Sequence, residues 1–343
     1  MLLKRLSEAY GVSGDEGEVR DILSEELVGH GELRTDTIGN LFVHKNTGRQ
    51  PRVMLAAHMD EVGLIVVGHE KSGLLRVHKV GSIDDRVLVS KPVVVGKNRV
   101  PGVIGAKPIH LQKPEERKKA INIENLFVDL GARSQDEAEK LAKIGDYVAF
   151  KAGTREIGEN CLVGKAFDNR AGCAILAEVL KEDYALDLTG VFTVQEEIGL
   201  RGSGVAAYSV YPDFALVIET TSASDVPGTK EAGHVTKLGA GPALTLMDSS
   251  FIAPQQVVDL LVQTAEKHAI PYQFRRLTTA ATDAGKISQT HAGILTAVVS
   301  VPCRYIHSPA SILSLSDWQN TLRLVRAILN SIAEGGLPVC GNY

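Results

Sequence analysis

Residues 52–67 read RVMLAAHMDEVGLIVV, and this stretch decides the fold class. Two apolar runs flank a polar cluster at residues 58–61. The first run, residues 53–57, is short and continuous, which is typical of a strand buried on both faces of a parallel sheet. Polar residues directly after such a strand lie where an open α/β sheet places its ligands. The stretch therefore predicts a buried strand that ends at a functional site.

Helical and strand patterns alternate around this stretch. Before it, residues 18–27 have the spacing of an amphipathic helix and residues 40–45 that of a strand. After residue 161 the sequence predicts helices at 168–182, 254–269 and 316–332, and strands at 188–195, 214–220 and 295–301. Ser316 is the expected cap of the last helix. Strands that alternate with helices predict an α/β fold, with a mainly parallel sheet covered by helices on both faces.

The pattern changes between residues 68 and 161. Short β-type runs, separated by Gly, Pro, Asn and Asp, are typical of a small β-sandwich or barrel. Residues 134–143 are expected to form a short helix capped by Ser134. We therefore expect a catalytic domain made of residues 1–67 and 162–343, and an inserted β-rich domain of residues 68–161. Exposed strand edges in that insert would suit contacts between subunits.

The composition excludes several classes of partner and location. A net charge of −4 over 343 residues argues against a nucleic-acid or anionic-membrane partner, because both require basic surface. No apolar run approaches the ~20 residues that span a bilayer. The four cysteines (Cys161, Cys173, Cys303 and Cys340) show no CxxC spacing, which predicts a reduced, cytoplasmic chain. Any metal would then be bound by His, Asp and Glu.

His58 and Asp60 end the first predicted strand. Residues i and i+2 of an extended chain point to the same side, so Asp60 could orient the His58 ring, as carboxylates do for metal-bound histidines. The simpler alternative is a surface histidine at a strand end. Asp168 opens the helix predicted at 168–182, and a role as its N-cap would be reason enough for its presence.

Glu196 and Glu197 follow the apolar run GVFTV. In a solvated loop the repulsion between them would be relieved, which is the structural alternative. The functional interpretation assigns one to a metal and the other to acid–base catalysis, because successive side chains on a strand point opposite ways. Glu219 and His307 also follow predicted strands. Together these residues supply two histidines and several carboxylates without a thiolate, a set that suits two divalent ions.

Beyond these residues, the sequence resembles the tetrahedral (TET) aminopeptidases, which include bacterial glutamyl aminopeptidase and archaeal deblocking aminopeptidases. The resemblance covers nearly the whole chain. Its motifs are GVSGDEGEVRDIL (11–23), DTIGNLFV (36–43), AAHMDEVGLIV (56–66), VPGVIGAKPIHLQ (100–112), NLFVDLGARSQDEAEKL (125–141), AFDNRAGCA (166–174), VQEEIGLRGS (194–203), TTAATDAGKI (278–287) and AGILTAVVSVPCRYIHSP (292–309).

The resemblance implies a phosphorylase/hydrolase-like catalytic domain, a β-rich insert that mediates assembly, and a hollow homo-dodecamer. It implies hydrolysis of N-terminal residues from short peptides with two divalent ions, zinc or cobalt. The implied ligands are His58, Asp168 and Glu219 for one ion, and Asp168, Glu197 and His307 for the other. Glu196 would be the general base that deprotonates a metal-activated water, and Asp60 would orient His58.

The chain departs from the family pattern at three positions. Many members have Asp where this chain has Asn169, Asp where it has Glu219, and Glu where it has Ser311. These departures leave open a catalytically inactive assembly or binding protein. A glycosidase is the other alternative, prompted by Glu196 and Glu197. Its two carboxylates must flank the bond at ~5–9.5 Å, which neighbours on one strand do not readily do.

Overall fold

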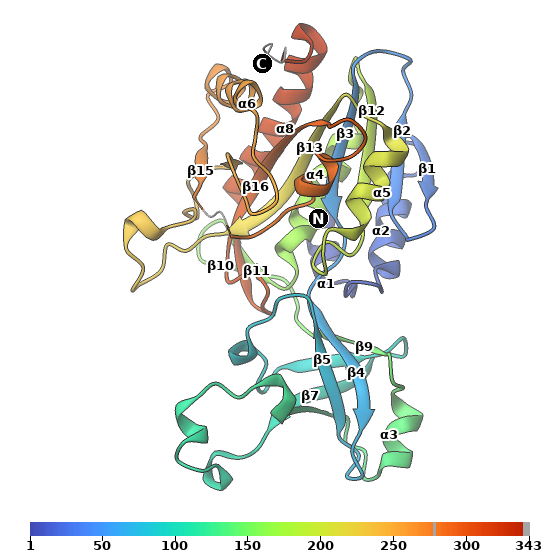
Figure 1. Cartoon of the computed structure of the whole chain (residues 1–343), viewed down its shortest axis with the longest axis vertical. Coiled ribbons are helices and arrows are strands. Elements are labelled where there is room, and N and C mark those ends of the chain that lie inside the picture. The colour runs from blue at the N-terminus through green and yellow to red at the C-terminus, as the bar shows by residue number, and fades with distance from the viewer. Residues whose placement is uncertain (277–278, 339–343) are drawn as a thin grey trace.

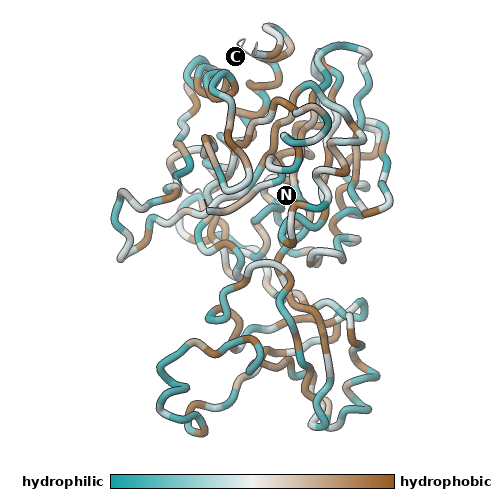
Figure 2. The backbone as a smooth tube through the Cα atoms, viewed as in Figure 1, coloured by the Kyte–Doolittle hydropathy of each residue, from teal (hydrophilic) through white to brown (hydrophobic). Residues whose placement is uncertain are grey.

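The computed structural model describes residues 1–276 and 279–338. A large α/β part carries the sheet and most helices, and a small barrel lies beneath it (Figure 1). Figure 2 shows that the most hydrophobic segments run through the strands of the sheet. Cys340 and Thr278, the first residue of the TTAATDAGKI motif, lie outside the described residues. Among the described residues, none of the helices combines the length and the apolar character that a membrane span requires.

The large sheet has a parallel centre. Its main path, in spatial order, is β1 (Glu32–Thr35), β2 (Leu41–Lys45), β12 (Asp187–Thr193), β3 (Arg52–His58), β13 (Phe214–Ser222), β16 (Leu295–Arg304), β17 (Ser311–Ser314), β11 (Cys161–Gly164) and β10 (Arg155–Ile157). Strands β12, β3, β13 and β16 are parallel, and the flanking strands are antiparallel. The short strands β14 (Ala243–Thr245) and β15 (Gln273–Arg275) extend the sheet beside β16. The predicted α/β fold class is confirmed, with a mixed sheet.

Helices cover both faces of this sheet. One face packs against α1 (Leu2–Glu8), α2 (Gly17–Leu27), α4 (Phe167–Leu180) and α8 (Leu315–Gly335), and the other against α5 (Arg201–Val210) and α7 (Ala284–Ile287); α6 (Gln255–Lys267) contributes to both cores. Strand β3 contributes side chains to the cores on both faces of the sheet. Val53 and Leu55 enter the first core, and Met54 and Ala56 enter the second. Side chains alternate along a strand, so a continuous apolar run buries both faces.

The barrel has its own apolar core. Its strands close in the order β4 (Gly63–His69), β5 (Leu75–Val80), β8 (Leu126–Asp129), β7 (Val100–Ala106), β6 (Pro92–Val95) and β9 (Tyr147–Phe150). The structure therefore confirms a small β-barrel, as predicted. Its assignment to an inserted domain of residues 68–161 stays a proposal. The expectation of exposed strand edges fails for the barrel, because its closure pairs the barrel strands on both sides. Within residues 68–161 it holds for β10, the exposed last strand in the order of the large sheet.

Helix α3 (Gln135–Leu141) begins at the predicted cap, where Ser134 Oγ accepts a hydrogen bond from Glu137 N. The predicted cap of α8 is wrong: Ser314, not Ser316, accepts from Asp317 N. Short 3₁₀ turns complete the described elements: η1 (Asp85–Val87), η2 (Ile109–Leu111), η3 (Glu116–Lys118), η4 (Ile123–Asn125) and η5 (Glu231–Gly233).

Candidate metal centre

The predicted ligands meet at the carboxyl edge of the parallel strands. His58 ends β3, Glu219 lies in β13, and the segments after β12 and β16 bring Glu197 and His307. Parallel strands that share an edge place their C-terminal residues side by side, which is why positions far apart in sequence converge. The predicted ligands line a pocket of about 400 Å³. A larger cavity, of about 1060 Å³, lies between α2 and the barrel. We assign the site to the smaller pocket because it holds the clustered metal-ligand atoms.

Asp168 lies between the two histidines. Its Oδ1 is 3.4 Å from His58 Nε2, and its Oδ2 is 3.4 Å from His307 Nε2. On one side Glu219 Oε2 lies 3.6 Å from His58 Nε2, and on the other Glu197 Oε1 lies 3.1 Å from His307 Nε2. Asp168 thus belongs to two sets of ligand atoms, each set lying within 4.8 Å.

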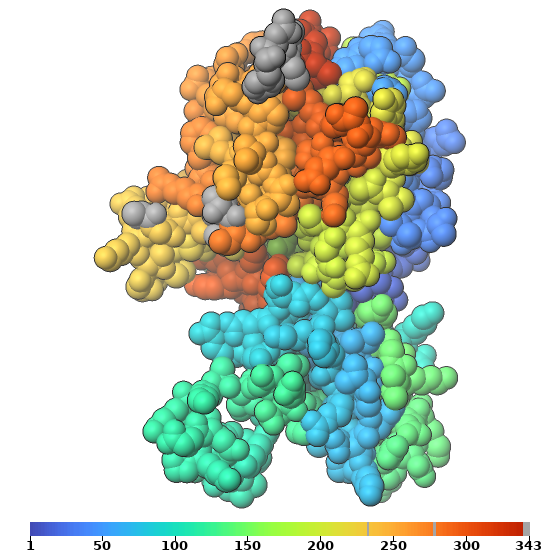
Figure 3. All heavy atoms as spheres, viewed as in Figure 1, coloured from blue at the N-terminus to red at the C-terminus, as the bar shows by residue number. Residues whose placement is uncertain are grey.

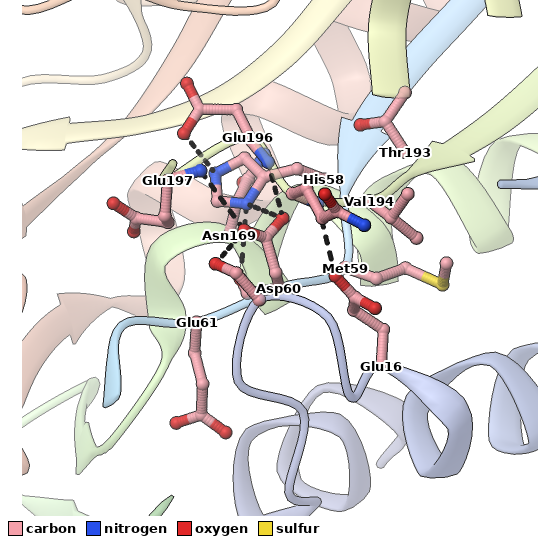
Figure 4. A network of polar contacts seen from close by, with 12 residues as sticks. Glu16, His58, Met59, Asp60, Glu61, Asn169, Thr193, Val194, Glu196 and Glu197 are labelled. Atoms are coloured by element: carbon pink, nitrogen blue, oxygen red, sulfur yellow. Dashed lines mark hydrogen bonds and ion pairs between the residues drawn. The ribbon is translucent and has the colours of Figure 1, made fainter. Parts of the chain in front are cut away.

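Asp60 contacts the opposite nitrogen of His58 (Figure 4). Its Oδ1 lies 3.4 Å from His58 Nδ1, which leaves Nε2 free to face Asp168. Burial by itself raises the pKa of Asp60, but His58 and the hydroxyl donated by Ser13 bring it below its ordinary value. Asp60 therefore stays ionised and fixes the ring, as predicted for a carboxylate beside a metal-binding histidine.

Asp168 is not the cap of α4, so that structural interpretation is wrong. Ala166 takes the N-cap position with φ 53°, and Asp168 and Asn169 have non-helical backbone angles. This kink points the Asp168 carboxylate at His58 and His307. Burial raises the pKa of Asp168, but the two histidines outweigh burial and hold the pKa well below its ordinary value.

Asn169 ties this kink to the neighbouring strand. Its side-chain nitrogen donates to the carbonyl of Ile218 at 2.8 Å, and its oxygen accepts from Gly172 N at 3.1 Å. Thr220 Oγ also donates to that oxygen at 3.2 Å. An amide can donate and accept at once, which an ionised Asp cannot. Asn169 therefore holds α4 against β13, the strand that carries Glu219.

The expectation that Glu196 and Glu197 point to opposite sides of a strand is wrong. Strand β12 ends at Thr193, and Gln195 turns the chain with φ 58°. Both side chains consequently reach the cluster around His58. Glu196 Oε2 lies 3.9 Å from His58 Nε2, outside the two sets that share Asp168.

The electrostatics of the site favour bound cations. Burial, with the neighbouring Glu219 and Glu197, raises the pKa of Glu196 well above its ordinary value despite the opposing effect of His58. Burial alone would lower the pKa of His307, but Glu197 and Asp168 raise it to about 11. The raised pKa of His307, and the part of the Glu196 shift caused by Glu219 and Glu197, reflect buried negative charge that divalent ions would relieve.

The donor set also fits metal ions. Among the described residues, Glu219 Oε1 is buried without a hydrogen-bond partner. Glu197 Oε1, although 3.1 Å from His307 Nε2, is not aligned for a hydrogen bond. Buried carboxylate oxygens without partners are costly unless a cation satisfies them. Two imidazoles and several carboxylates are ligands that zinc and similar divalent ions accept.

Three buried residues beside the site were not predicted from sequence. Asp283 accepts a hydrogen bond from Thr193 Oγ at 2.6 Å, Cys173 Sγ donates to the carbonyl of His58 at 3.1 Å, and Arg275 lines the pocket. Asp283 and Cys173 lie in two of the motifs that the chain shares with the TET aminopeptidases, which was the available signal. Arg275 lies in β15, which the sequence did not predict. Cys161, Cys173 and Cys303 are free thiols.

Comparisons with known proteins agree with this geometry. Residues 39–324 match the family described as M42 glutamyl aminopeptidase, and residues 1–23 match one described as AMPT. Lysyl aminopeptidase of Pyrococcus furiosus is 32% identical over 340 residues, covering 96% of each chain. The TET aminopeptidase of a marine sediment Thaumarchaeota archaeon is 36% identical, with a TM-score of 0.94 and 98% of each chain covered. PhTET1-12s, a dodecamer in the asymmetric unit, is 32% identical with a TM-score of 0.85, covering 95% of this chain and 97% of its own.

Proposed function

Because the chain belongs to the M42 glutamyl aminopeptidase family, and is thereby a metal-dependent aminopeptidase, we propose that it releases N-terminal residues from short peptides at a two-metal site. One observation carries the proposal: the two oxygens of Asp168 face His58 and His307 at 3.4 Å each. A carboxylate shared in this way is suited to bridging two ions.

The two sets of ligands divide between the ions. His58, Asp168 and Glu219 would hold the first, and Asp168, Glu197 and His307 the second. Imidazole and carboxylate donors favour zinc or cobalt over magnesium or calcium. Ions bound there would polarise the scissile carbonyl group and lower the pKa of a water molecule.

Glu196 is the proposed general base. It lies outside the two ligand sets that share Asp168, and with His58 and Glu197 it forms a third group of potential ligand atoms. If the two ions occupy the sets that share Asp168, the Glu196 carboxylate is left for proton transfer. A group that accepts a proton and returns it to the leaving amine works best when its pKa lies near the ambient pH. Burial raises the pKa of Glu196 in that direction, against the lowering that bound ions would cause. Asp60 positions both the metal ligand His58 and the base Glu196. It contacts the His58 ring and accepts hydrogen bonds from Glu196 N and Glu197 N.

The three departures from the family pattern do not favour an inactive protein. The Glu219 carboxylate still reaches within 3.6 Å of His58 Nε2. Asn169 braces the kink that aims Asp168. Ser311 Oγ donates to the carbonyl of Tyr305 at 3.0 Å, which steadies the loop that carries His307. The glycosidase alternative is not favoured, because the chain belongs to an aminopeptidase family and Glu196 and Glu197 both lie in the cluster around His58.

We also propose a homo-oligomer, a dodecamer like PhTET1-12s, in which the segment 68–161 makes subunit contacts. The segment with η2 and η3 projects from the barrel at the lower left (Figure 3). It exposes Ile109 at 68% and Leu111 at 60%, and exposed apolar side chains on a projecting loop favour burial in an interface. The free thiols support a cytoplasmic location.

Metal reconstitution tests the proposed function. The purified chain, stripped and reloaded with Zn²⁺ or Co²⁺, should bind two ions per chain and hydrolyse aminoacyl-p-nitroanilides, and a chelator should abolish both. His307→Ala should lose one ion. His268→Ala, which removes an exposed histidine of the same domain, should keep two. A wild-type chain that retains no divalent metal would refute the two-metal site.

A further inference from the structure

The chain that leads from β12 to the proposed base is held by side chains from three other segments. The four residues that follow β12, residues 194–197, each donate their backbone N–H to a side-chain oxygen. Successive N–H groups at a turn form a concave donor surface that binds oxygen atoms, anionic ones above all. Here the chain supplies the acceptors itself; in the order of the donors they are Asn40 Oδ1 at 3.0 Å, Glu16 Oε1 at 3.2 Å, and Asp60 Oδ1 and Oδ2 at 3.0 and 3.1 Å.

Glu16 is a buried carboxylate to which the proposed mechanism gives no role. It is 4% exposed and occupies the N-cap position of α2, yet its side chain makes no capping hydrogen bond to that helix. Its Oε1 accepts instead from Gly14 N at 2.8 Å and from Gln195 N. Figure 4 shows Glu16 at the start of the helix, below Val194 and Glu196 in the view. Because burying a carboxylate is costly, its position calls for a reason other than the helix.

The turn at Gln195 is where Glu16 acts on the site. Gln195 has a left-handed backbone with φ 58°, and it directly precedes Glu196. A left-handed residue other than glycine persists only where its surroundings enforce the conformation. The carbonyl of Gln195 accepts from Arg201 N at 3.2 Å, a contact within the same loop. Its N–H donates to Glu16, so this second bond ties the turn to a distant segment.

We infer that Glu16 is a positioning residue for the general base, because its hydrogen bond with Gln195 N keeps the turn that directs Glu196 into the site. This inference rests on the proposed function, which assigns the base to Glu196. Asp60 holds the same stretch but also contacts the metal ligand His58. The hydrogen bonds of Glu16 go to Gly14 and Gln195 and to no proposed metal ligand. Its loss should therefore reduce catalysis and leave metal binding intact.

Two substitutions at Glu16 test the hydrogen bond. Glu16→Ala should lower kcat by about ten- to hundredfold, the effect of displacing a catalytic group by ~1 Å, and should keep two ions per chain. Glu16→Gln should recover most of the activity, because the amide oxygen still accepts from both N–H groups. Glu25→Ala, which removes a carboxylate 73% exposed on the same helix, should behave as the wild type.

The fold is expected to survive Glu16→Ala. Glu16 and Gln195 both line the cavity of about 1060 Å³ between α2 and the barrel. Water in a cavity of that size can accept from the N–H that the substitution frees, so the donor is not left unpaired. Circular dichroism and metal content of each variant verify this before kcat is compared.

A double-mutant cycle separates positioning of Glu196 from a general effect on the protein. If Glu16 acts through the base, Glu16→Ala should cost little further activity once Glu196→Gln has removed the base. A residue that only supports the fold would cost the same factor in both backgrounds. That equal loss, with Glu196→Gln itself impaired, would overturn the inference, and so would a normal kcat in Glu16→Ala.

Hydrogen exchange reads the turn without turnover. Peptides that contain residues 194–197 should exchange about tenfold faster in Glu16→Ala than in the wild type and in Glu16→Gln, as expected for the loss of one hydrogen bond to a charged group. Unchanged exchange in Glu16→Ala would show that Glu16 does not hold the turn. If exchange rises as expected but Glu196→Gln remains active, the proposed base fails and the hold of Glu16 on the turn stands.

Discussion

The Asp60 carboxylate lies 3.4 Å from His58 Nδ1 and also accepts hydrogen bonds from the backbone of Glu196 and Glu197 at 3.0 and 3.1 Å. One buried side chain therefore connects the end of β3 to the segment after β12. It fixes the nitrogen of His58 that faces the site, and it fixes the start of the loop that bears two functional carboxylates. Ser13, from the segment before α2, completes the arrangement by donating its hydroxyl to Asp60 at 2.6 Å.

Asp60→Asn should weaken metal binding by about ten- to hundredfold, the usual effect of removing the carboxylate behind a metal-bound histidine. The neutral amide gives His58 a weaker acceptor and loses at least one of the two backbone hydrogen bonds. Metal affinity is measured by competition with a chelator, and circular dichroism checks the fold. Asp21→Asn, an exposed substitution of the same kind on α2, should leave the affinity unchanged. Unaltered affinity in Asp60→Asn would show that the contact is not needed.

Glu196→Gln should keep both metal ions and lose activity by about 10²–10⁴-fold, as expected for loss of a general base. Glutamine preserves the shape of the side chain but cannot accept the proton. Glu197→Gln is the informative partner, because it should lose metal as well as activity. Elemental analysis and kcat measured on the same samples separate the two roles. Near-normal turnover in Glu196→Gln would remove Glu196 from the mechanism.

The site was predictable from the sequence where it depends on strand ends. His58, Glu219 and His307 follow or end apolar runs, and the edge of a parallel sheet brings such positions together. The sequence did not reveal that Asp168 is no helix cap, because the direction of its side chain depends on the left-handed backbone of Ala166 before it. The directions of Glu196 and Glu197 were not predictable for a related reason: β12 ends before them, and the turn at Gln195 changes the course of the chain.

Arg275 shows a different limit. Strand β15 is only three residues long, and it exists because it pairs with β14, which in turn pairs with β16. Such pairing between segments distant in sequence leaves no periodicity to detect. The burial of Arg275 beside the metal ligands is therefore a property of the tertiary structure. The closed barrel is a similar case, since its short runs indicate strands but not the pairing that removes their edges.

A buried lysine predicts a pH dependence of stability. Lys165 is 1% exposed, and its ammonium group donates to Glu61 and to the carbonyl of Ala9, each at 2.6 Å. Burial lowers its pKa from 10.5 to about 8, although Glu61 opposes the shift. Between these values the unfolded chain binds more protons than the folded one. The unfavourable contribution of Lys165 is thus complete below about pH 8 and disappears as the pH rises to 10.5.

The stability of the wild type relative to Lys165→Met should accordingly increase by roughly 3 kcal/mol between these pH values. Denaturant unfolding of both proteins at each pH gives the difference, and titrations common to the two proteins cancel. Lys4→Met, at an exposed position of α1, should show no such change relative to the wild type. A constant difference between wild type and Lys165→Met would mean that Lys165 titrates in the folded state as it does in the unfolded chain.

Light scattering at micromolar concentration should give a large homo-oligomer, and a monomeric wild type would contradict the proposed assembly. Joint substitution of Ile109→Asp and Leu111→Asp should yield a smaller species, because charges would replace the exposed apolar side chains of η2 in the interface. Circular dichroism and metal content should remain those of the wild type. An unchanged mass in the double variant would place the interface elsewhere.

Cleavage restricted to the first peptide bond depends on recognition of the N-terminal end of the peptide. A two-metal site can attack any amide bond, so selective removal of N-terminal residues requires that the free α-amine be recognised. The pocket offers the means, because an ion held there would accept a neutral amine as a ligand and the nearby Glu196 carboxylate can hold the protons of the amine. Anchoring the amine there places the first peptide bond, and no later one, beside the attacking water. Loss of the anchor removes its positioning contribution, which can reach several kcal/mol.

An acetyl group converts the amine into an uncharged amide that carboxylates do not attract. We therefore expect stepwise release of single residues from a free peptide, and cleavage of its N-acetylated form at least a hundredfold slower, since ~2.7 kcal/mol of lost positioning corresponds to that factor. Mass spectrometry of the products over time measures both. The two peptides differ at one atom group only, so sequence and length cannot account for a difference. Equal rates, or internal fragments from either peptide, would show that cleavage does not depend on the chain end.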